Sequence, residues 1–406
     1  MASVIAPHVA DGGVVGAPDL MRGTPSPAHR LVTLDNWRRP PFNRWSFQHV
    51  RELMPSVAIS RGTGPVWELP SKPADVLGSG AGSVREIVDR TYTDALVVLR
   101  DGEIIAEEYY QGMDSATKHL CMSVSKSLTS TLFGAAVGKG LIDPEALVTD
   151  TLPELGDTSY AGARWRHMLD MRTGTARLGD ELYDQELQIT GWQPITDTSL
   201  VPDIWPVYTG LPNVKEHGSE YDYRSFLTCL LGWGAERAAG MRHGELFSAW
   251  LWSLLGAEHE AEMTVDGHGN ALSDVGLSAT PRDLARFGEL MRRGGLSGTG
   301  ERVVPDSWVR DIVTPDPDSI DVFGQRGHFY LPLDGAYYRN QWWVAREGTR
   351  GGVYYASGIY GQMIMVHEPA RMVVVKHSTW PEHWIDEFAQ ATIQGFIALG
   401  DQLAAE

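Results

Sequence analysis

The chain has 406 residues, of which 43% are hydrophobic and 21% are charged, a composition typical of a folded globular protein. This length fits one large two-lobed domain or two domains. The 34 basic and 52 acidic residues give a net charge of −18. Nucleic acid or an anionic membrane is therefore disfavoured as the main partner, because both carry negative charge.

The cysteine count and the N-terminus bear on the compartment. Only Cys121 and Cys229 occur, so no disulfide framework is expected and the reducing cytoplasm is the default location. No lysine or arginine precedes an apolar segment between Met1 and Met21, so this stretch does not resemble a normal secretory signal. Its proline, glycine and alanine content predicts a flexible or draped arm over residues 1–33.

Strand signals occur near both ends of the chain. The β-prone runs 95–99 and 104–110 flank Asp101-Gly102, a dipeptide typical of a hairpin turn. Runs 362–366 and 372–376 flank Glu368-Pro-Ala-Arg371 and predict a second hairpin. A further strand is predicted at 341–345.

The middle of the chain has helical signals instead. Helices are predicted at 125–139, 247–255, 278–293 and, near the C-terminus, 382–403. In the third, Thr280 is the candidate N-cap and Pro281 takes the first helical position. The pattern predicts an α+β fold, with one antiparallel sheet built from both chain ends, flanked by helices, and an inserted helical lobe. The expected divisions are residues 34–122 and 331–406 for the α/β lobe and 123–330 for the helical lobe.

The motif Ser-x-x-Lys occurs twice, at Ser115–Lys118 and Ser123–Lys126. On a helix these two residues lie on one face, where a buried amine can act as a base toward the hydroxyl. Ser115 lies in a polar stretch typical of a solvated loop. Ser123 opens an apolar helical stretch, so it is the candidate nucleophile and Lys126 the candidate base. An ordinary capping serine at a helix N-terminus remains the alternative.

Two downstream segments supply groups that such chemistry needs. Tyr223-Arg-Ser225 offers a phenol that can carry protons to a leaving group. Tyr221 competes for that role, and either tyrosine can also be a core residue. Ser357 and Gly358 form a small-residue segment along which a substrate can lie, and the amide of Ile359 can help to bind an oxyanion together with the amide of Ser123.

The three segments resemble, in order and spacing, the motifs of the serine β-lactamase and penicillin-binding-protein superfamily, class C-like members in particular. The segment Gly276–Gly288 resembles a helix of the same family. The chain is most similar to the 6-aminohexanoate-dimer hydrolases, the nylon-oligomer enzymes, in segments that include Asp35–Trp45 and Met122–Leu128. The resemblance implies a β-lactamase-like fold with the site between the two lobes.

The sequence departs from these families at three positions. Ala356 stands where β-lactamases and DD-peptidases usually have a lysine or histidine that binds the substrate carboxylate. Arg177 aligns with a tyrosine that assists amide cleavage in the nylon-oligomer hydrolases, and Tyr360 stands where they have histidine. Ester hydrolysis needs less help for its leaving group than amide hydrolysis does.

We therefore expect a serine hydrolase that cleaves small-molecule carboxylic esters through an acyl-enzyme on Ser123, with Lys126 and Tyr223 as proton carriers. The alternatives are an amidase on 6-aminohexanoate oligomers or D-amino-acid peptides, β-lactamase-like activity and, disfavoured, a non-catalytic binding protein. No cofactor and no metal are expected, because H-E-x-x-H is absent and two isolated cysteines cannot form a structural zinc site. The expected partner is a small-molecule ester or amide. A homodimer is a further possibility that the sequence does not decide. The substrate-binding candidates are Arg177, Ser225, Trp342, Ser357, Gly358 and Tyr360, with Trp343 as a further wall residue.

Overall fold

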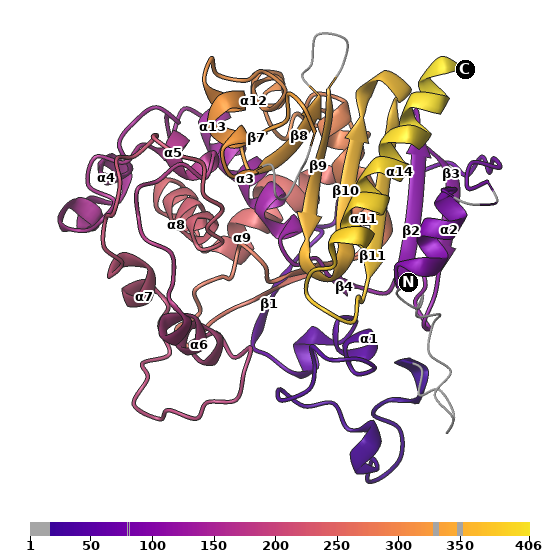
Figure 1. Ribbon diagram of the computed structural model, residues 1–406, viewed down its shortest axis with the longest axis horizontal. Helices are drawn as coiled ribbons and strands as arrows, with labels where there is room; N and C mark the ends of the chain where they lie inside the picture. The colour runs from indigo at the N-terminus through magenta and orange to yellow at the C-terminus, as the bar shows by residue number, and fades with distance from the viewer. Residues whose placement is uncertain (1–16, 79, 81, 328–332, 347–351) are drawn as a thin grey trace.

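The computed structural model describes residues 17–78, 80, 82–327, 333–346 and 352–406. Its centre is a seven-stranded sheet in the order β3-β2-β11-β10-β9-β8-β7 (Figure 1). All neighbouring strands are antiparallel. The strands are β2 Thr93–Arg100, β3 Glu103–Tyr109, β7 Tyr337–Arg339, β8 Trp342–Arg346, β9 Val353–Gly358, β10 Gln362–His367 and β11 Met372–Ser378. The pairing of β2 with β11 confirms that both chain ends build one sheet.

Local turn chemistry explains the two predicted hairpins. Asp101 and Gly102 have φ of 54° and 78°, the pair of positive values that a tight type I′ hairpin turn requires. Between β10 and β11 the chain turns through the short helix η9, Glu368–Ala370, and Arg371 at φ 53°. Both hairpins therefore form where the sequence predicts them.

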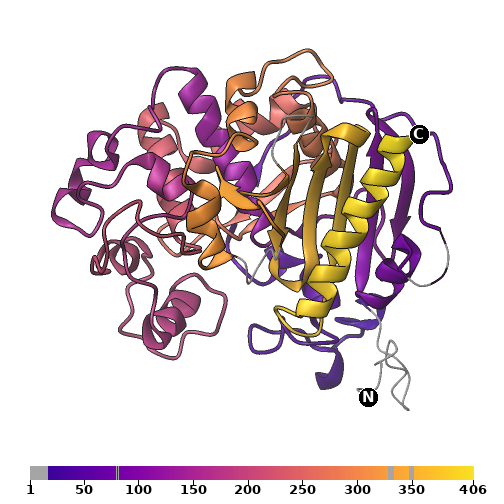
Figure 2. The same cartoon turned by 45° about the horizontal axis from the view of Figure 1, so that its top comes forward.

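Helices cover both faces of this sheet. The C-terminal helix α14, Asp386–Ala405, crosses one face and packs on α2, Val84–Arg90 (Figure 2). Helix α11, Pro281–Arg292, packs on the opposite face against β2, β10 and β11. At Gly288 a Cβ would meet Val373 at 2.4 Å, so glycine lets α11 approach the sheet closely.

A second, smaller sheet was not predicted. It has the strand order β1-β5-β6-β4. The strands are β1 Ser56–Ile59, β4 His119–Leu120, β5 Ala261–Thr264 and β6 Leu277–Ala279. The predicted helix start at Ser278 was wrong, because Ser278 and Ala279 lie in β6. The helix begins after Thr280, whose hydroxyl accepts a hydrogen bond from the amide of Asp283 as the predicted N-cap does.

The remaining helices form a lobe beside the large sheet (Figure 1). They are α3 Val124–Gly138, α4 Val148–Thr151, α5 Trp165–Leu169, α6 Asp180–Ile189, α7 Trp205–Thr209, α8 Leu227–Ala239, α9 His243–Phe247, α10 Ser253–Leu255, α12 Asp306–Ile312 and α13 Ser319–Gly324. Helix α3 packs on α8 and also on β9, so it joins the lobe to the sheet. The stretch 123–330 is not purely helical, since it contains the strands β5 and β6, and its helix α11 packs on the large sheet.

The N-terminal segment packs on the body of the protein from residue 17 onward. It includes α1, Asn43–Ser46. Ala17, Leu20 and Val32 are buried in an aromatic cluster with Trp37 and Tyr360. The described part of the expected arm is therefore packed, whereas residues 1–16 lie outside the described residues. No described helix is both long and apolar enough to cross a membrane.

Candidate active site

Ser123 lies at the start of α3, and two residues separate it from the end of β4. The preceding residue, Met122, is buried and has φ 49°, a strained backbone conformation that turns the chain sharply into the helix. Lys126 follows one helical turn later, and its Nζ lies 3.0 Å from Ser123 Oγ. Lys126 is only 1% exposed, so its amine is shielded from solvent, whereas Ser123 is partly exposed. The Ser-x-x-Lys spacing thus produces the contact that the motif predicts.

The amine of Lys126 is held from two further sides. Its Nζ donates to Ser225 Oγ at 2.8 Å and to the carbonyl oxygen of Asp274 at 2.8 Å. Ser225 in turn donates its single hydroxyl hydrogen to Asp274 Oδ2 at 2.5 Å, so toward Lys126 it acts as an acceptor. These two acceptors take two of the hydrogens on Lys126 Nζ, so the third bonding position of this nitrogen is directed at Ser123 Oγ. That position holds a hydrogen in the ammonium form and a lone pair in the amine form.

Asp274 is a site residue that the sequence interpretation missed. It is buried, its Oδ2 lies 3.8 Å from Lys126 Nζ, and its Oδ1 accepts a hydrogen bond from Cys229 Sγ. It comes from the loop between β5 and β6, elements that the sequence did not predict. No local pattern around Asp274 distinguishes it from other loop aspartates.

The structure places Tyr223, and not Tyr221, beside Ser123 and Lys126. Tyr223 lines the same cavity as Ser123, and Lys126 Nζ lies 5.5 Å from the centroid of its ring. The ring stacks on Trp343 with centroids 5.5 Å apart. Tyr221 is 2% exposed and packs against Phe323 in the core.

Ser123 opens onto a small cavity of about 70 Å³ between the lobes. Its lining is mostly aromatic and aliphatic: Ser123, Tyr223, Trp343, Tyr355, Ser357, Gly358, Ile359, Trp384 and Ile393. A Cβ at Gly358 would lie 3.0 Å from the amide nitrogen of Ser123, so only glycine lets the end of β9 approach the start of α3 this closely. The amides expected to bind an oxyanion, those of Ser123 and Ile359, thus belong to residues on one cavity wall.

Some predicted substrate-binding residues lie elsewhere. Trp342 is 0% exposed and stacks near Phe287 of α11, so it is a core residue. Its neighbour Trp343 points to the opposite face of β8 and lines the cavity, as the alternation of side chains along a strand requires. Of the two tryptophans named from the sequence, the structure places only Trp343 at the cavity.

Tyr360 and Arg177 are also outside the lining of this cavity. Tyr360 is buried at φ 61°, and its ring packs on Phe47 with centroids 5.1 Å apart. Arg177 has a half-exposed side chain that pairs with Asp222. The guanidinium of Arg177 is therefore engaged by a carboxylate.

One further carboxyl group lies near this network. Burial raises the pKa of Glu186, on α6, to about 7, and the nearby negative charge of Asp274 acts in the same direction. Tyr208 donates a hydrogen bond to its Oε1 at 2.5 Å. Glu186 therefore changes protonation near neutral pH.

We expect Tyr223→Phe to lower kcat for an ester about 10²-fold, because it removes only the hydroxyl while the ring keeps its stacking on Trp343. The matched variant is Tyr221→Phe, which changes a hydroxyl in the core and is expected to retain nearly full activity. Steady-state kinetics on both variants provides the measurement. A larger loss in Tyr221→Phe than in Tyr223→Phe would reverse the assignment.

Comparisons with known proteins identify the family of this chain. A family model described as Beta-lactamase matches residues 82–392. The chain is 34% identical over 372 residues to the 6-aminohexanoate-dimer hydrolase of Paenarthrobacter ureafaciens, with 89% of this chain and 92% of the relative covered.

Solved structures share the fold. A Bacillus anthracis protein provisionally described as a 6-aminohexanoate-dimer hydrolase superposes with a TM-score of 0.81 at 24% identity, over 93% of this chain and 98% of that chain. A family VIII carboxylesterase matches with a TM-score of 0.57 at 14% identity, over 82% of this chain and 100% of that chain. At such identities these two structures establish the fold alone.

Proposed function

We propose that this chain, which belongs to the beta-lactamase family of hydrolases, is a serine hydrolase that cleaves small-molecule carboxylic esters through an acyl-enzyme on Ser123. The β-lactamase-like α+β fold expected from the sequence is confirmed by the family match and by the superposed structure. The observation that carries the proposal is the contact of Lys126 Nζ with Ser123 Oγ, 3.0 Å long, at the wall of an apolar cavity.

In the proposed acylation step, Ser123 Oγ attacks the ester carbonyl carbon. Its proton passes to the lone pair of Lys126, which Ser225 and Asp274 hold toward it. The amides of Ser123 and Ile359 donate hydrogen bonds to the oxyanion as it forms. Tyr223 then gives its proton to the departing alkoxide and takes the serine proton from Lys126 in its place, so the leaving alcohol dissociates and both groups regain their starting protonation.

In the proposed deacylation step, water attacks the acyl-enzyme carbonyl. Lys126 and Tyr223 accept the proton of the water and return one to Ser123 Oγ, which releases the acid. The same two groups serve both steps because both pass through a tetrahedral oxyanion at the same carbon.

Two features favour esters over β-lactams and amides. Ala356 is 1% exposed and lacks a charge, so it offers no cation to a penicillin carboxylate, and charge-assisted hydrogen bonds contribute roughly 1.5–3 kcal/mol. Arg177 pairs with Asp222, and it replaces the hydroxyl that assists amine departure in the families that the sequence resembles. An amine leaves poorly unless it is protonated in the transition state, whereas an alkoxide needs less help.

An amidase is the second candidate, because the relative at 34% identity is named 6-aminohexanoate-dimer hydrolase. The cavity at Ser123 measures about 70 Å³, which leaves room for a short acyl group in either case. The nature of the leaving group thus separates the two candidates.

The test compares rates on a short-chain p-nitrophenyl ester, the linear 6-aminohexanoate dimer and nitrocefin, with Ser123→Ala as the blank for each. We expect ester turnover to exceed the other two by at least about 10²-fold. Equal turnover of the dimer and the ester would refute the ester preference and support the amidase. Acylation by a fluorophosphonate without turnover of any substrate would instead support a non-catalytic binding protein.

A further inference from the structure

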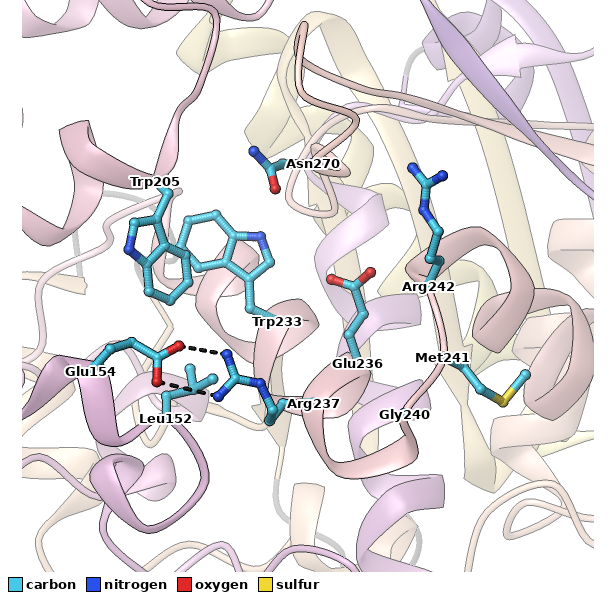
Figure 3. Close-up of a pocket in the computed structure, with 10 residues that line it drawn as sticks. All are labelled: Leu152, Glu154, Trp205, Trp233, Glu236, Arg237, Gly240, Met241, Arg242 and Asn270. Carbon is cyan, nitrogen blue, oxygen red and sulfur yellow. Dashed lines mark hydrogen bonds and ion pairs between the residues drawn. The ribbon is translucent and has the colours of Figure 1, made fainter.

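A second cavity lies in the helical lobe, and it shares no lining residue with the cavity at Ser123. It measures about 550 Å³ and lies between α7, α8 and the loop that carries Asn270 (Figure 3). Nothing in the proposed hydrolysis uses it. Its lining combines aromatic rings with polar groups that point toward one another.

Two tryptophans form the aromatic side of this cavity. The rings of Trp205 and Trp233 pack with centroids 4.1 Å apart at an angle of 40°, and Trp205 remains partly exposed. Trp233 is only 7% exposed, and its indole nitrogen has no hydrogen-bond partner among the described residues. In Figure 3 this nitrogen points toward the side on which Asn270 and Glu236 lie.

The polar side of the cavity offers acceptors. Asn270 donates both amide hydrogens away from the cavity, to Asp203 at 3.1 Å and to Asp266 at 2.8 Å, so its Oδ1 is left for a ligand. Glu236 accepts a hydrogen bond from the amide of His243 at 2.5 Å through one oxygen. Burial raises the pKa of Glu236 to about 7, so near neutral pH its carboxyl group can donate or accept a hydrogen bond.

The two arginines that line the cavity differ in whether their charge is available to a ligand. Arg237 makes a two-bonded ion pair with Glu154, at 2.6 and 3.2 Å, so its charge is compensated. Arg242 is exposed and also lines a neighbouring cavity of about 130 Å³. His243 on the wall of that cavity is 3% exposed, and neither of its ring nitrogens has a partner among the described residues. Two cavities thus adjoin at Arg242, each beside a buried side chain with a ring nitrogen that has no partner within the described part of the chain.

We propose that these adjoining cavities bind an oligosaccharide, with one sugar ring on Trp205 and its hydroxyl groups bonded to Asn270 and Glu236. A hydroxyl group both donates and accepts, so one ligand can satisfy the indole N–H of Trp233 and the oxygens of Asn270 and Glu236 together. The apolar C–H face of a sugar ring matches the exposed face of an indole. An exposed arginine that faces both cavities suits a ligand longer than one ring.

Other ligand classes match this lining less well. An organic cation stacks on tryptophan but brings no acceptor for the indole N–H of Trp233. An extended peptide binds by adding a strand to a sheet edge. The larger cavity, which holds both tryptophans, is lined by helices and loops, and the edge strand β1 lines only the smaller cavity, through Val57 and Ala58. The net charge of −18 disfavours a polyanion.

The test titrates the full chain with maltotriose, cellotriose and chitotriose by isothermal calorimetry, with tetramethylammonium and trialanine as comparison ligands. We expect one trisaccharide to bind with a Kd in the millimolar range or tighter, about −4 kcal/mol or stronger. We expect Trp205→Ala and Glu236→Gln each to weaken that binding about tenfold. Ester hydrolysis should stay unchanged in both, because neither residue lines the cavity at Ser123.

Trp250→Phe is the matched control, since Trp250 is a partly exposed tryptophan beneath Lys139 and lines neither cavity. It should bind the trisaccharide as the unmodified chain does. If circular dichroism shows that Trp205→Ala does not fold, trisaccharide binding by the isosteric variant Glu236→Gln tests the proposal instead. Absence of binding by all three sugars, equal binding by Glu236→Gln, or binding of tetramethylammonium or trialanine alone would each overturn the proposal.

Discussion

Replacing Ser123 by alanine is expected to lower kcat for any ester substrate by about 10⁵-fold or more, because it removes the hydroxyl proposed to form the acyl-enzyme. The fold should survive. The Ser123 side chain makes no capping hydrogen bond to α3, so its removal leaves the start of the helix intact. Steady-state kinetics measures the loss, and a thermal melt checks stability.

Ser115→Ala is the matched control, because Ser115 belongs to the other Ser-x-x-Lys pair. Its lysine, Lys118, forms ion pairs with Glu260 and Glu262, so it is not directed at Ser115 alone. This variant should be close to neutral. Mass spectrometry after fluorophosphonate labelling should place the adduct on Ser123, and an adduct on Ser115 would contradict the assignment.

Lys126→Arg is expected to slow acylation about 10⁴-fold, the upper end of the range for a general acid–base group. Arginine keeps the positive charge but offers no accessible lone pair. Its larger head group must also fit a site where Lys126 is 1% exposed. Single-turnover kinetics with a p-nitrophenyl ester measures the acylation rate. Retention of more than about a tenth of that rate, equivalent to about 1.4 kcal/mol of barrier, would exclude the base role.

A second variant separates the base from the groups that position it. Asp274→Asn keeps the backbone carbonyl that accepts from Lys126 and keeps a side-chain oxygen for Ser225, but it removes the negative charge. We expect a loss of about tenfold, together with a displaced pH–rate profile, since the charge beside Lys126 changes. An unchanged pH profile would mean that Asp274 acts through its backbone alone.

The sequence predicted those elements whose signals are local. The first hairpin follows from Asp101-Gly102, because both residues accept the positive φ that the turn requires. The N-terminus of α11 follows from Thr280 and Pro281, because the N-cap hydrogen bond and the proline position are both set within the first turn of the helix. The small sheet gave no such signal, since its strands are two to four residues long and pair across large sequence separations.

By itself the sequence determined the contact between Ser123 and Lys126, because the two residues are one helical turn apart and helix geometry alone brings them together. Only the tertiary structure decided the rest of the site. Alternation along β8 puts Trp342 and Trp343 on opposite faces, but the packing of α11 on one face decides that Trp343 reaches the cavity. Asp274 reaches Lys126 from a distant loop. Such contacts depend on how separate elements pack, which no spacing along the chain encodes.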